Sequence, residues 1–292
     1  MFGMEALPLE IVPLYFDLDG TFPNHEANPL DPANLLDLQK AVPAHGADLG
    51  LAFDGDADRC FVVDERGEPI SPSAITALVA AREIAKEKAA GRQATVIHNL
   101  ITSRTVPEVI GENGAKAIRT RVGHAFIKVE MAKADAVFGG EHSAHYYFRD
   151  FWFADTGMLA ALHVLAALGE QSGPLSGLVA EYERYTASGE INSKVSDVEE
   201  ATARVADAFA GRPGVVVDEL DGLTVSHEAD APDSTGGDSG SEGLWWFNLR
   251  PSNTEALLRL NAEAKVPEVM ERIRDEVLAL VRVAAPASDA SG

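Results

Sequence analysis

The sequence predicts an α/β protein with two mixed α/β domains, the first of them partial, followed by a smaller C-terminal α+β domain. Three observations predict this. A chain of 292 residues is too long for one ordinary hydrophobic core. Short apolar runs alternate with helical patterns as far as residue 186, which is typical of α/β domains. Extended runs then predominate and only two helices are expected, which indicates an α+β domain. We expect the domains to cover residues 1–68, 69–186 and 187–292.

The first domain is expected to contain strands at Leu9–Phe16 and Leu49–Phe53, a helix from Pro32 to about Val42, and a strand with a turn at 61–67. Asp31 followed by Pro32 is typical of a helix start. The Asp side chain can cap the first turn, and a helix tolerates Pro at its first position.

The second domain continues the alternation of strands and helices. Its expected strands are 95–100, 117–122 and 136–139, and its expected helices begin near Ser71 or Ser73, at Ser103, at Gly123, at Gly157 with Asp155 as the cap, and at Leu175, running to Tyr185. The third domain has expected strands at 189–195, 215–219, 223–227, 244–249 and 256–260, and helices at 198–210 and 266–283. The segment 231–243 is rich in Gly, Ser and Asp, which indicates a surface loop.

Composition excludes several classes of partner. The formal net charge of −22 argues against a nucleic acid or an anionic membrane surface as partner, because both attract clustered Lys and Arg. No apolar run reaches eighteen residues, so we expect no membrane span. The opening lacks the basic start of a secretory signal, so we expect a cytoplasmic protein. The single cysteine, Cys60, rules out an intramolecular disulfide and fits a buried thiol better than a nucleophile.

Three aspartates alternate along the loop after the strand 49–53. Asp54, Asp56 and Asp58 place hard oxygen donors on one side of a tight loop. Mg²⁺ takes such donors at about 2.0–2.1 Å and usually keeps positions for water or a phosphate oxygen. Arg59 adds a planar donor that suits a phosphate or one of these carboxylates. The alternatives are an Asp-rich surface turn and an EF-hand loop, but an EF-hand needs glycine where Arg59 stands.

A second acidic segment, Asp17 to Thr21, follows the expected strand 9–16. An apolar strand followed by Asp-x-Asp-Gly-Thr resembles the nucleophile loop of haloacid-dehalogenase phosphotransferases. In such an enzyme Asp17 would attack phosphorus and Asp19 would act as the acid. An Asp-nucleophile phosphatase is therefore an alternative reading of the sequence.

Polar groups also gather in two later loops and at one helix start. The loop between the last two strands carries Arg250, Ser252, Asn253 and Thr254. An arginine, hydroxyls, an amide and backbone N–H groups on one turn suit a phosphate, although an ordinary polar turn has a similar composition. The loop with Glu141, Ser143 and His145 could hold paired sugar hydroxyls or be structural. His124, at a helix start, could transfer a proton or simply cap the helix.

Taken together, these motifs resemble those of the α-D-phosphohexomutase family. The segments Asp54–Arg59, Gly123–His124, Gly140–His145 and Arg250–Thr254 occur in the order and approximate spacing of that family. From Leu14 to about Val283 the chain resembles its phosphomannomutase/phosphoglucomutase branch. The segment 19–25 also resembles part of that family's second domain, which speaks against the dehalogenase reading.

The resemblance implies a role for each of these residues. Asp54, Asp56 and Asp58 would bind Mg²⁺, Arg59 would lie against a phosphorylated serine, and His124 would relay a proton. Glu141, Ser143 and His145 would bind the sugar, and Arg250, Ser252, Asn253 and Thr254 would bind the phosphate that is not being transferred. The family interconverts hexose 1- and 6-phosphates through a phosphoserine and a bisphosphate intermediate. The substrate would be a mannose or a glucose phosphate, and the Glu141 loop suits both.

Three departures from the family shape our expectations. The phosphoserine of the family lies in a first domain, in a Thr-x-Ser-His-Asn-Pro loop that these 292 residues do not contain. We therefore expect the chain alone to be inactive, unless a separate polypeptide supplies that domain, and a non-catalytic sugar-phosphate-binding relative is the alternative. The strands that lead the second domain are also missing, so we expect an unpaired sheet edge. A lysine that many members carry would fall near 99–101, where this chain has none; Arg104, Arg119 or Arg121 are the candidates to replace it.

Overall fold

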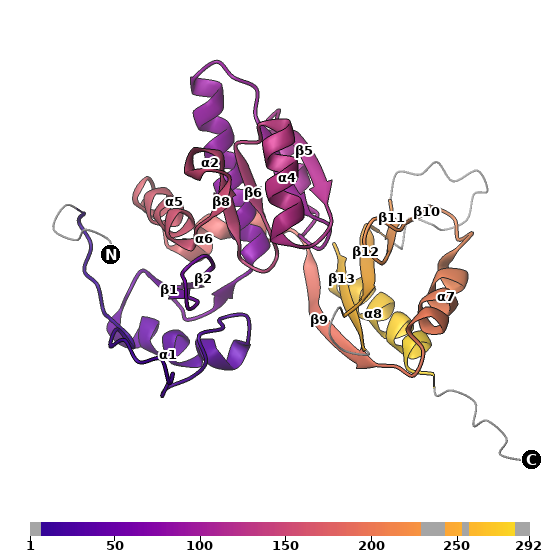
Figure 1. Ribbon diagram of the computed structural model, residues 1–292. Coiled ribbons are helices and arrows are strands. Elements are labelled where there is room, and N and C mark those ends of the chain that lie inside the picture. The colour runs from indigo at the N-terminus through magenta and orange to yellow at the C-terminus, as the bar shows by residue number, and fades with distance from the viewer. Residues whose placement is uncertain (1–6, 229–242, 253–256, 284–292) are drawn as a thin grey trace, which may run out of the picture.

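The computed structural model describes residues 7–228, 243–252 and 257–283, and within them three sheets follow one another along the chain (Figure 1). We call them the N-terminal sheet (β1–β3), the middle sheet (β4–β8) and the C-terminal sheet (β9–β13). This mixed α/β architecture confirms the predicted fold class.

The N-terminal sheet is antiparallel, with strand order β1-β2-β3. Its elements are β1 (Leu49–Phe53), β2 (Cys60–Asp64) and β3 (Pro69–Ile70), preceded by the 3-10 helix η2 (Pro32–Leu35) and by α1 (Leu36–His45). The helix start at Asp31 is confirmed, because its side chain accepts a hydrogen bond from the Ala33 backbone N–H at 2.9 Å. As expected, β1 lies at an edge of this sheet.

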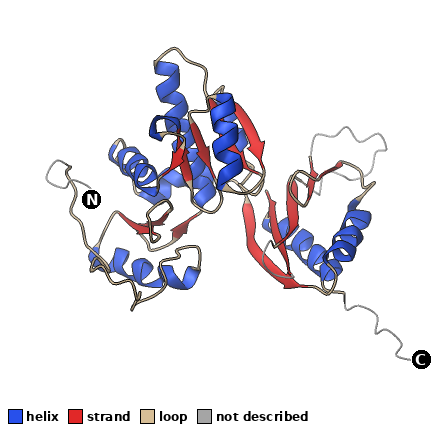
Figure 2. Ribbon diagram, viewed as in Figure 1, coloured by secondary structure: helices blue, strands red, loops and turns tan. Residues whose placement is uncertain are grey.

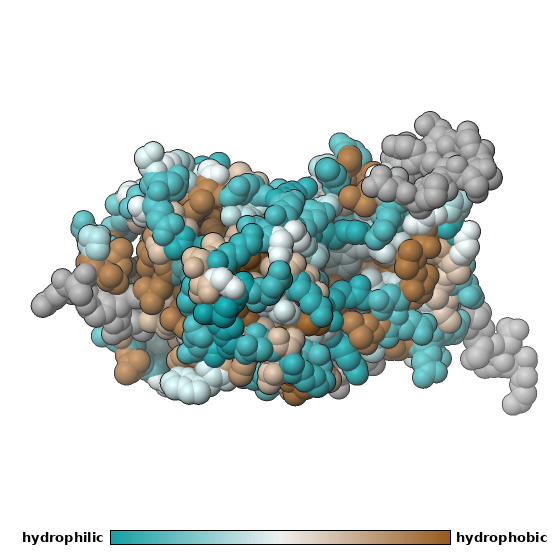
Figure 3. Space-filling view, turned by 90° about the horizontal axis from the view of Figure 1, so that it is seen from above, coloured by the Kyte–Doolittle hydropathy of each residue, from teal (hydrophilic) through white to brown (hydrophobic). Residues whose placement is uncertain are grey.

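The prediction of a strand from Leu9 to Phe16 is wrong. No strand forms over this segment, and Tyr15 and Phe16 are exposed. A strand persists only where another group takes up its backbone hydrogen bonds, and β1 pairs with β2 rather than with this segment. Apolar patches are visible beside the N-terminal end of the chain (Figure 3).

The middle sheet has the strand order β5-β4-β6-β7-β8. Strands β5, β4 and β6 are parallel, whereas β7 and β8 are antiparallel to their neighbours. The strands are β4 (Thr95–Asn99), β5 (Lys116–Thr120), β6 (Phe138–Gly140), β7 (Tyr146–Phe148) and β8 (Ala154–Asp155); the helices are α2 (Pro72–Ala89), α3 (Thr105–Glu112), α4 (His124–Ala134), α5 (Gly157–Gly169) and α6 (Leu175–Val179), with short 3-10 helices η3 (Arg149–Phe151) and η4 (Ala180–Tyr182).

Helices cover both faces of the middle sheet. On one face, Ile127 and Met131 of α4 pack with Ile97 and Tyr147. On the other, α2, α3 and α5 form a larger core that also takes in β2, for example Val62, so the first two sheets share one core. None of the described helices is long and apolar enough to cross a membrane.

The C-terminal sheet is antiparallel, with strand order β10-β11-β12-β13-β9. Its strands are β9 (Thr186–Lys194), β10 (Val215–Asp218), β11 (Leu223–His227), β12 (Trp245–Pro251) and β13 (Leu257–Ala264), and its helices are α7 (Val198–Phe209) and α8 (Pro267–Val281). Both helices lie on one side of the sheet (Figure 2), where Val205 and Ile273 pack in a core with Phe247. This is the expected α+β arrangement.

The other face of the C-terminal sheet is turned toward the middle sheet. Side chains alternate along a strand, so Trp246 of β12 points away from the core that Trp245 and Phe247 join. Trp246 packs with Leu100 and Ile101, which follow β4. Residues of β12 and β13 in phase with Trp246 therefore share the face that meets the middle part of the chain.

Candidate active site

The three aspartates lie close together in the loop that joins β1 to β2. One carboxylate oxygen from each of Asp54, Asp56 and Asp58 lies within 4.8 Å of the others. Ala57 has a positive φ of 60°, which turns the loop tightly between the second and third aspartates. Asp58 Oδ1 is buried and has no hydrogen-bond partner in the described part of the chain. Three convergent oxygen ligands, one of which accepts no hydrogen bond from the described residues, fit a hard divalent cation such as Mg²⁺.

Arg59 binds the first aspartate. Its Nε donates to Asp54 Oδ2 at 2.6 Å, and its backbone N–H donates to Asp54 Oδ1 at 3.1 Å. Burial raises the pKa of Asp54, but these hydrogen bonds outweigh that effect and leave the pKa lowered. At Asp58, burial and the neighbouring Asp54 carboxyl raise the pKa to about 7. The loop therefore holds one firmly ionised carboxylate, Asp54, and one that readily takes up a proton, Asp58.

The Glu141 loop connects β6 to β7 and lies against the aspartate loop. Arg59 and His145 form a β-bridge, and the Cys60 backbone N–H donates to Ala144 O at 3.3 Å. His145 Nε2 lies 3.6 Å from Asp58 Oδ2, and its Nδ1 lies 2.9 Å from Ser143 Oγ. The structure thus brings together two loops that are far apart in the sequence.

Glu141 is buried and fully engaged by neighbouring groups. Its carboxylate accepts hydrogen bonds from Tyr147 Oη at 2.6 Å, from Asn99 Nδ2 at 3.0 Å and from the Gly123 backbone N–H at 3.3 Å. The last bond ties the start of α4 to the Glu141 loop. His124 is exposed at the start of α4. The hydrogen bond to Glu141 comes from the backbone N–H of its neighbour Gly123 and not from the His124 imidazole.

Sequence reasoning missed several residues around this site. Lys128 of α4 lies 2.8 Å from Asp155 and over the ring of Tyr147. Asp155, predicted to cap α5, instead pairs with this lysine, and it also lies within 4.8 Å of Asp58 and His145. The sequence gives little indication of Lys128 and Tyr147. Lys128 has the pattern of an ordinary lysine on a helix surface, and Tyr147 that of a core residue in a strand.

The arginines considered as replacements for a missing lysine have other partners. Arg104 pairs with Glu228 at 3.3 Å, Arg119 pairs with Asp218, and Arg121 lies 3.9 Å from Asp221. All three acids belong to the C-terminal part of the chain. Lys128 is also paired, but its partner Asp155 lies within 4.8 Å of Asp58 and His145, so Lys128 is the better candidate for a cation beside the Glu141 loop.

The predicted phosphate loop lies at the end of β12. Arg250 and Ser252 are described, whereas Asn253 and Thr254 lie outside the described residues. Arg250 is in phase with Trp246, so it lies on the face of the C-terminal sheet that is turned toward the middle sheet. Arg259, which sequence reasoning missed, lies directly opposite Arg250 on β13 and reaches Ser252 Oγ at 3.4 Å.

The second acidic segment does not form a nucleophile loop. Asp19 Oδ1 accepts hydrogen bonds from the Thr21 backbone N–H at 2.9 Å and from its hydroxyl at 2.7 Å, which closes a local exposed turn. Asp17 is exposed and follows no strand. The strand end that the dehalogenase reading requires is therefore missing.

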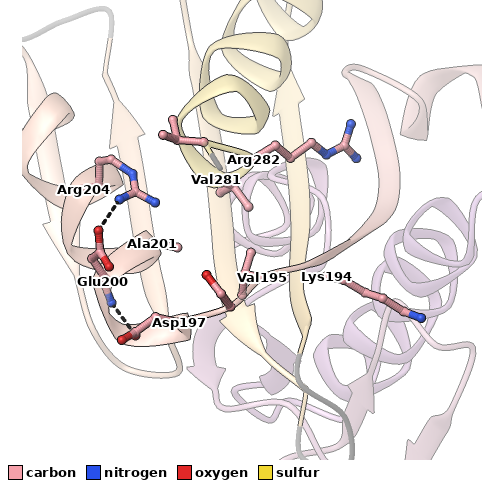
Figure 4. A pocket seen from close by; sticks show the side chains of 10 residues that line it. Lys194, Val195, Asp197, Glu200, Ala201, Arg204, Val281 and Arg282 are labelled. Atoms are coloured by element: carbon pink, nitrogen blue, oxygen red, sulfur yellow. Dashed lines mark hydrogen bonds and ion pairs between the residues drawn. The ribbon is translucent and has the colours of Figure 1, made fainter. Parts of the chain in front are cut away.

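A cavity of about 340 Å³ lies elsewhere, between the start of α7 and the end of α8 (Figure 4). Three of its charged lining residues bond within the lining: Arg204 pairs with Glu200 at 2.9 Å, and the Asp197 side chain accepts from the Glu200 backbone N–H. The aspartate loop and the Glu141 loop do not line this cavity, so we do not assign the active site to it.

Gly157 offers a test of how the aspartate loop is held. Its backbone N–H donates to Ala57 O at 3.1 Å, and a Cβ there would lie 2.5 Å from the backbone of Arg59. We expect Gly157→Ala to destabilise the protein by about 1–3 kcal/mol and to weaken Mg²⁺ binding, because the loop must shift. Thermal unfolding and Mg²⁺ calorimetry measure the two effects.

The matched control is Gly169→Ala, at the other end of the same helix, where a Cβ would meet nothing within 4 Å. It is expected to be neutral or to stabilise by up to about 1 kcal/mol. Equal behaviour of the two variants would contradict the proposed support of the loop.

Comparison with known protein families defines the class of protein to which this fold belongs. Family models of phosphoglucomutase/phosphomannomutase match residues 2–67 (alpha/beta/alpha domain II), 72–185 (alpha/beta/alpha domain III) and 190–280 (C-terminal domain). The chain belongs to this family. The dehalogenase reading is thereby wrong, since Asp17 falls inside the match to domain II.

Individual relatives support the same family assignment. The chain is 41% identical over 270 residues to a phosphomannomutase of Escherichia coli K12, which covers 91% of the chain and 55% of the relative. A crystal structure of a phosphoglucomutase/phosphomannomutase family protein from Burkholderia thailandensis has a TM-score of 0.78 at 28% identity, covering 98% of the chain and 57% of that protein. The chain thus spans about half the length of such relatives.

A more distant structure shares the fold alone. It is N-acetylphosphoglucosamine mutase from Aspergillus fumigatus in complex with GlcNAc-6P and magnesium, with a TM-score of 0.58 at 16% identity, covering 80% of the chain and 48% of that protein.

Proposed function

We propose that this chain forms the metal-, sugar- and phosphate-binding part of a phosphohexomutase that interconverts hexose 1- and 6-phosphates. The metal loop would belong to a domain over residues 1–68, the sugar loop to one over 69–186, and the phosphate loop to one over 187–292. The observation that carries the proposal is the convergence of Asp54, Asp56 and Asp58 directly against Arg59 and the Glu141–His145 loop. The magnesium and the sugar phosphate GlcNAc-6P in the distant Aspergillus fumigatus mutase support the choice of ligands.

Mg²⁺, when bound by the three aspartates, would neutralise charge on a phosphoryl group in transfer. Arg59 is held by Asp54 and by Asn28, 3.3 Å from its NH1, so its guanidinium is oriented beside the cation site. It would orient a phosphoserine and its phosphate. Arg250 and Ser252, with Asn253 and Thr254, would bind the phosphate that stays on the sugar, and Arg259 extends this set.

Glu141, Ser143 and His145 would bind the sugar hydroxyls. The Glu141 carboxylate is fixed by Tyr147, Asn99 and Gly123, so it is oriented before the substrate arrives. Ser143 Oγ and His145 Nδ1 share one hydrogen bond, and a hydroxyl of the sugar could replace it. His124, exposed at the start of α4, would relay a proton near the group in transfer.

The 292-residue chain contains no Thr-x-Ser-His-Asn-Pro loop. We therefore propose that it does not turn over by itself and that the phosphoserine comes from a domain carried elsewhere, in the same protein or in a separate polypeptide. A non-catalytic sugar-phosphate-binding protein remains the second candidate.

An assay with purified chain tests the proposal. The chain is supplied with Mg²⁺, glucose 1,6-bisphosphate and either glucose 1-phosphate or mannose 1-phosphate, alone and with the part of the Escherichia coli relative that it does not match. We expect Mg²⁺-dependent sugar-phosphate binding in calorimetry, no turnover alone, and turnover in the mixture. Steady turnover by the chain alone would contradict its dependence on another domain. Binding without turnover in the mixture would favour the non-catalytic candidate, and no binding would reject both.

A further inference from the structure

The carboxylate of Glu190 bridges Arg250 and Arg259 beside the predicted phosphate loop. Glu190 Oε2 lies 3.2 Å from Arg250 NH2, and Glu190 Oε1 lies 3.1 Å from Arg259 NH1. Each oxygen of the carboxylate thus accepts from a different guanidinium. Two oxygens of a phosphate group would bind the same two donors in the same way.

The strand register explains why these three side chains meet. Arg250 of β12 lies directly opposite Arg259 of β13, and two like charges in this arrangement repel each other. Glu190 of β9 lies opposite Asn261, two residues along from Arg259 on the same face, so it is a diagonal neighbour of Arg259. Glu190 therefore offsets a repulsion that the sheet itself creates.

The backbone next to Glu190 is also specialised. Gly189 has a positive φ of 67°, and the pairing of β9 with β13 shifts register between Asn261 and Glu263. Ser188 Oγ accepts from the Ala262 backbone N–H at 2.9 Å and donates to Gly189 O at 2.7 Å, which secures this irregularity. A bulge of this kind redirects a side chain, here the Glu190 carboxylate.

The arginines keep unused donor capacity. Nε of Arg250 and Nε of Arg259 are buried and have no hydrogen-bond partner within the described residues. The Arg250 side chain is only 14% exposed, whereas Glu190 is 31% exposed. An anion has more bonds to gain here than the single carboxylate supplies, and Glu190 can move out into solvent.

We propose that Glu190 is an internal stand-in for the phosphate of the substrate. It holds the two arginines together when no phosphate is bound, and the phosphate displaces it on binding. The carboxylate therefore weakens phosphate binding and speeds release. This inference rests on the proposed function, because it takes the anion of the Arg250 loop to be the phosphate of a hexose phosphate.

Inorganic phosphate titrated into the full chain tests the inference. We expect Glu190→Gln, which keeps the shape of the side chain and removes its charge, to lower the Kd for phosphate at least about ten-fold, since a competing negative charge is lost. Glu199→Gln, at an exposed position of α7 in the same part of the chain, serves as the control and should leave the Kd unchanged. Unchanged or weaker phosphate binding by Glu190→Gln would overturn the inference.

A second measurement does not depend on how the variant folds. In the unmodified chain, the ¹³C resonance of the Glu190 carboxylate should shift as phosphate saturates the site, because the carboxylate leaves both guanidiniums. Saturation without such a shift overturns the role of Glu190 but leaves the proposed function standing. If phosphate binds neither the unmodified chain nor Glu190→Gln, while Mg²⁺ binding is intact, both the inference and the phosphate site of the proposed function fail.

Discussion

Replacing Asp58 with asparagine is expected to weaken Mg²⁺ binding by at least about ten-fold. Asp58 is one of three aspartates whose oxygens lie within 4.8 Å of one another, and its Oδ1 has no hydrogen-bond partner in the described part of the chain. Changes to groups that merely support a metal ligand already cost about 10- to 100-fold in affinity, so loss of a charged ligand should cost no less. Calorimetry with Mg²⁺, or electron paramagnetic resonance with Mn²⁺, measures the change.

The same substitution should stabilise the metal-free chain slightly. Burial and the Asp54 carboxyl disfavour the ionised form of Asp58, which is why its pKa is raised. A neutral amide avoids that penalty, so thermal unfolding without metal should shift upward while the stabilisation by Mg²⁺ disappears.

Asp48→Asn, an exposed position just before β1, is the matched control and should leave both Mg²⁺ affinity and the stability of the metal-free chain unchanged. If Asp58→Asn binds Mg²⁺ as tightly as the unmodified chain, the aspartates do not form the metal site.

Elements with strong local signals could be predicted from the sequence. The strands Leu49–Phe53 and Leu223–His227 have the predicted bounds, and the cap at Asp31 is confirmed. Each of these depends on residues that are adjacent in the chain. The aspartates of the loop after β1 belong to the same group, because a single tight turn is enough to bring their oxygens together.

Elements that depend on distant partners could not be predicted. The apolar run Leu9–Phe16 has strand composition, but no strand in the described part of the chain pairs with it, so it stays irregular. Conversely, Tyr146–Phe148 and Ala154–Asp155 are too short to recognise, yet they form strands because β6 and β7 supply partners. The helix expected from Leu175 to Tyr185 ends at Val179 and continues as a 3-10 turn.

Contacts in the candidate site that depend on distant partners could not be predicted from the sequence either. A pattern of residue types made Arg250 and Glu141 candidates, but it could not show that Glu190 and Arg259 meet Arg250. That meeting requires the strand order β12-β13-β9 and its register, which follow from the packing of the whole sheet. The contact between Arg59 and His145 likewise depends on the shared core of the first two sheets.

Glu87→Gln is expected to destabilise the middle part of the chain by about 2 kcal/mol at pH 7. Glu87, on α2, has a side chain that is 1% exposed and accepts bidentate hydrogen bonds from Arg92 at 2.6 and 2.7 Å. Arg149 donates two more, at 2.7 and 3.2 Å, and so ties α2 to the end of β7. Charge-assisted bonds of this kind contribute about 1.5–3 kcal/mol, and solvent around the half-exposed Arg92 reduces that value.

The pH dependence follows from the direction of the pKa shift. Hydrogen bonds from Arg92 and Arg149 outweigh burial and lower the pKa of Glu87 to about 2. The pKa in the folded state lies below its ordinary value of 4.5, so the stabilisation is fully present above about pH 4.5 and is lost as the pH falls toward 2. The difference in stability between the unmodified chain and Glu87→Gln should therefore shrink between pH 5 and pH 2.

Hydrogen exchange of the α2 amides measures this local stability without requiring the whole chain to unfold in one step. Glu170→Gln is the matched control, because Glu170 also binds an arginine through both oxygens, Arg82 at 2.7 and 2.9 Å, but is 65% exposed. Solvent screens that exposed pair, so it should contribute much less to stability than the Glu87 pairs. A loss at Glu170 as large as at Glu87 would show that burial of Glu87 adds nothing, whereas a larger loss at Glu87 that fades in acid would establish its ion pairs as the link between α2 and β7.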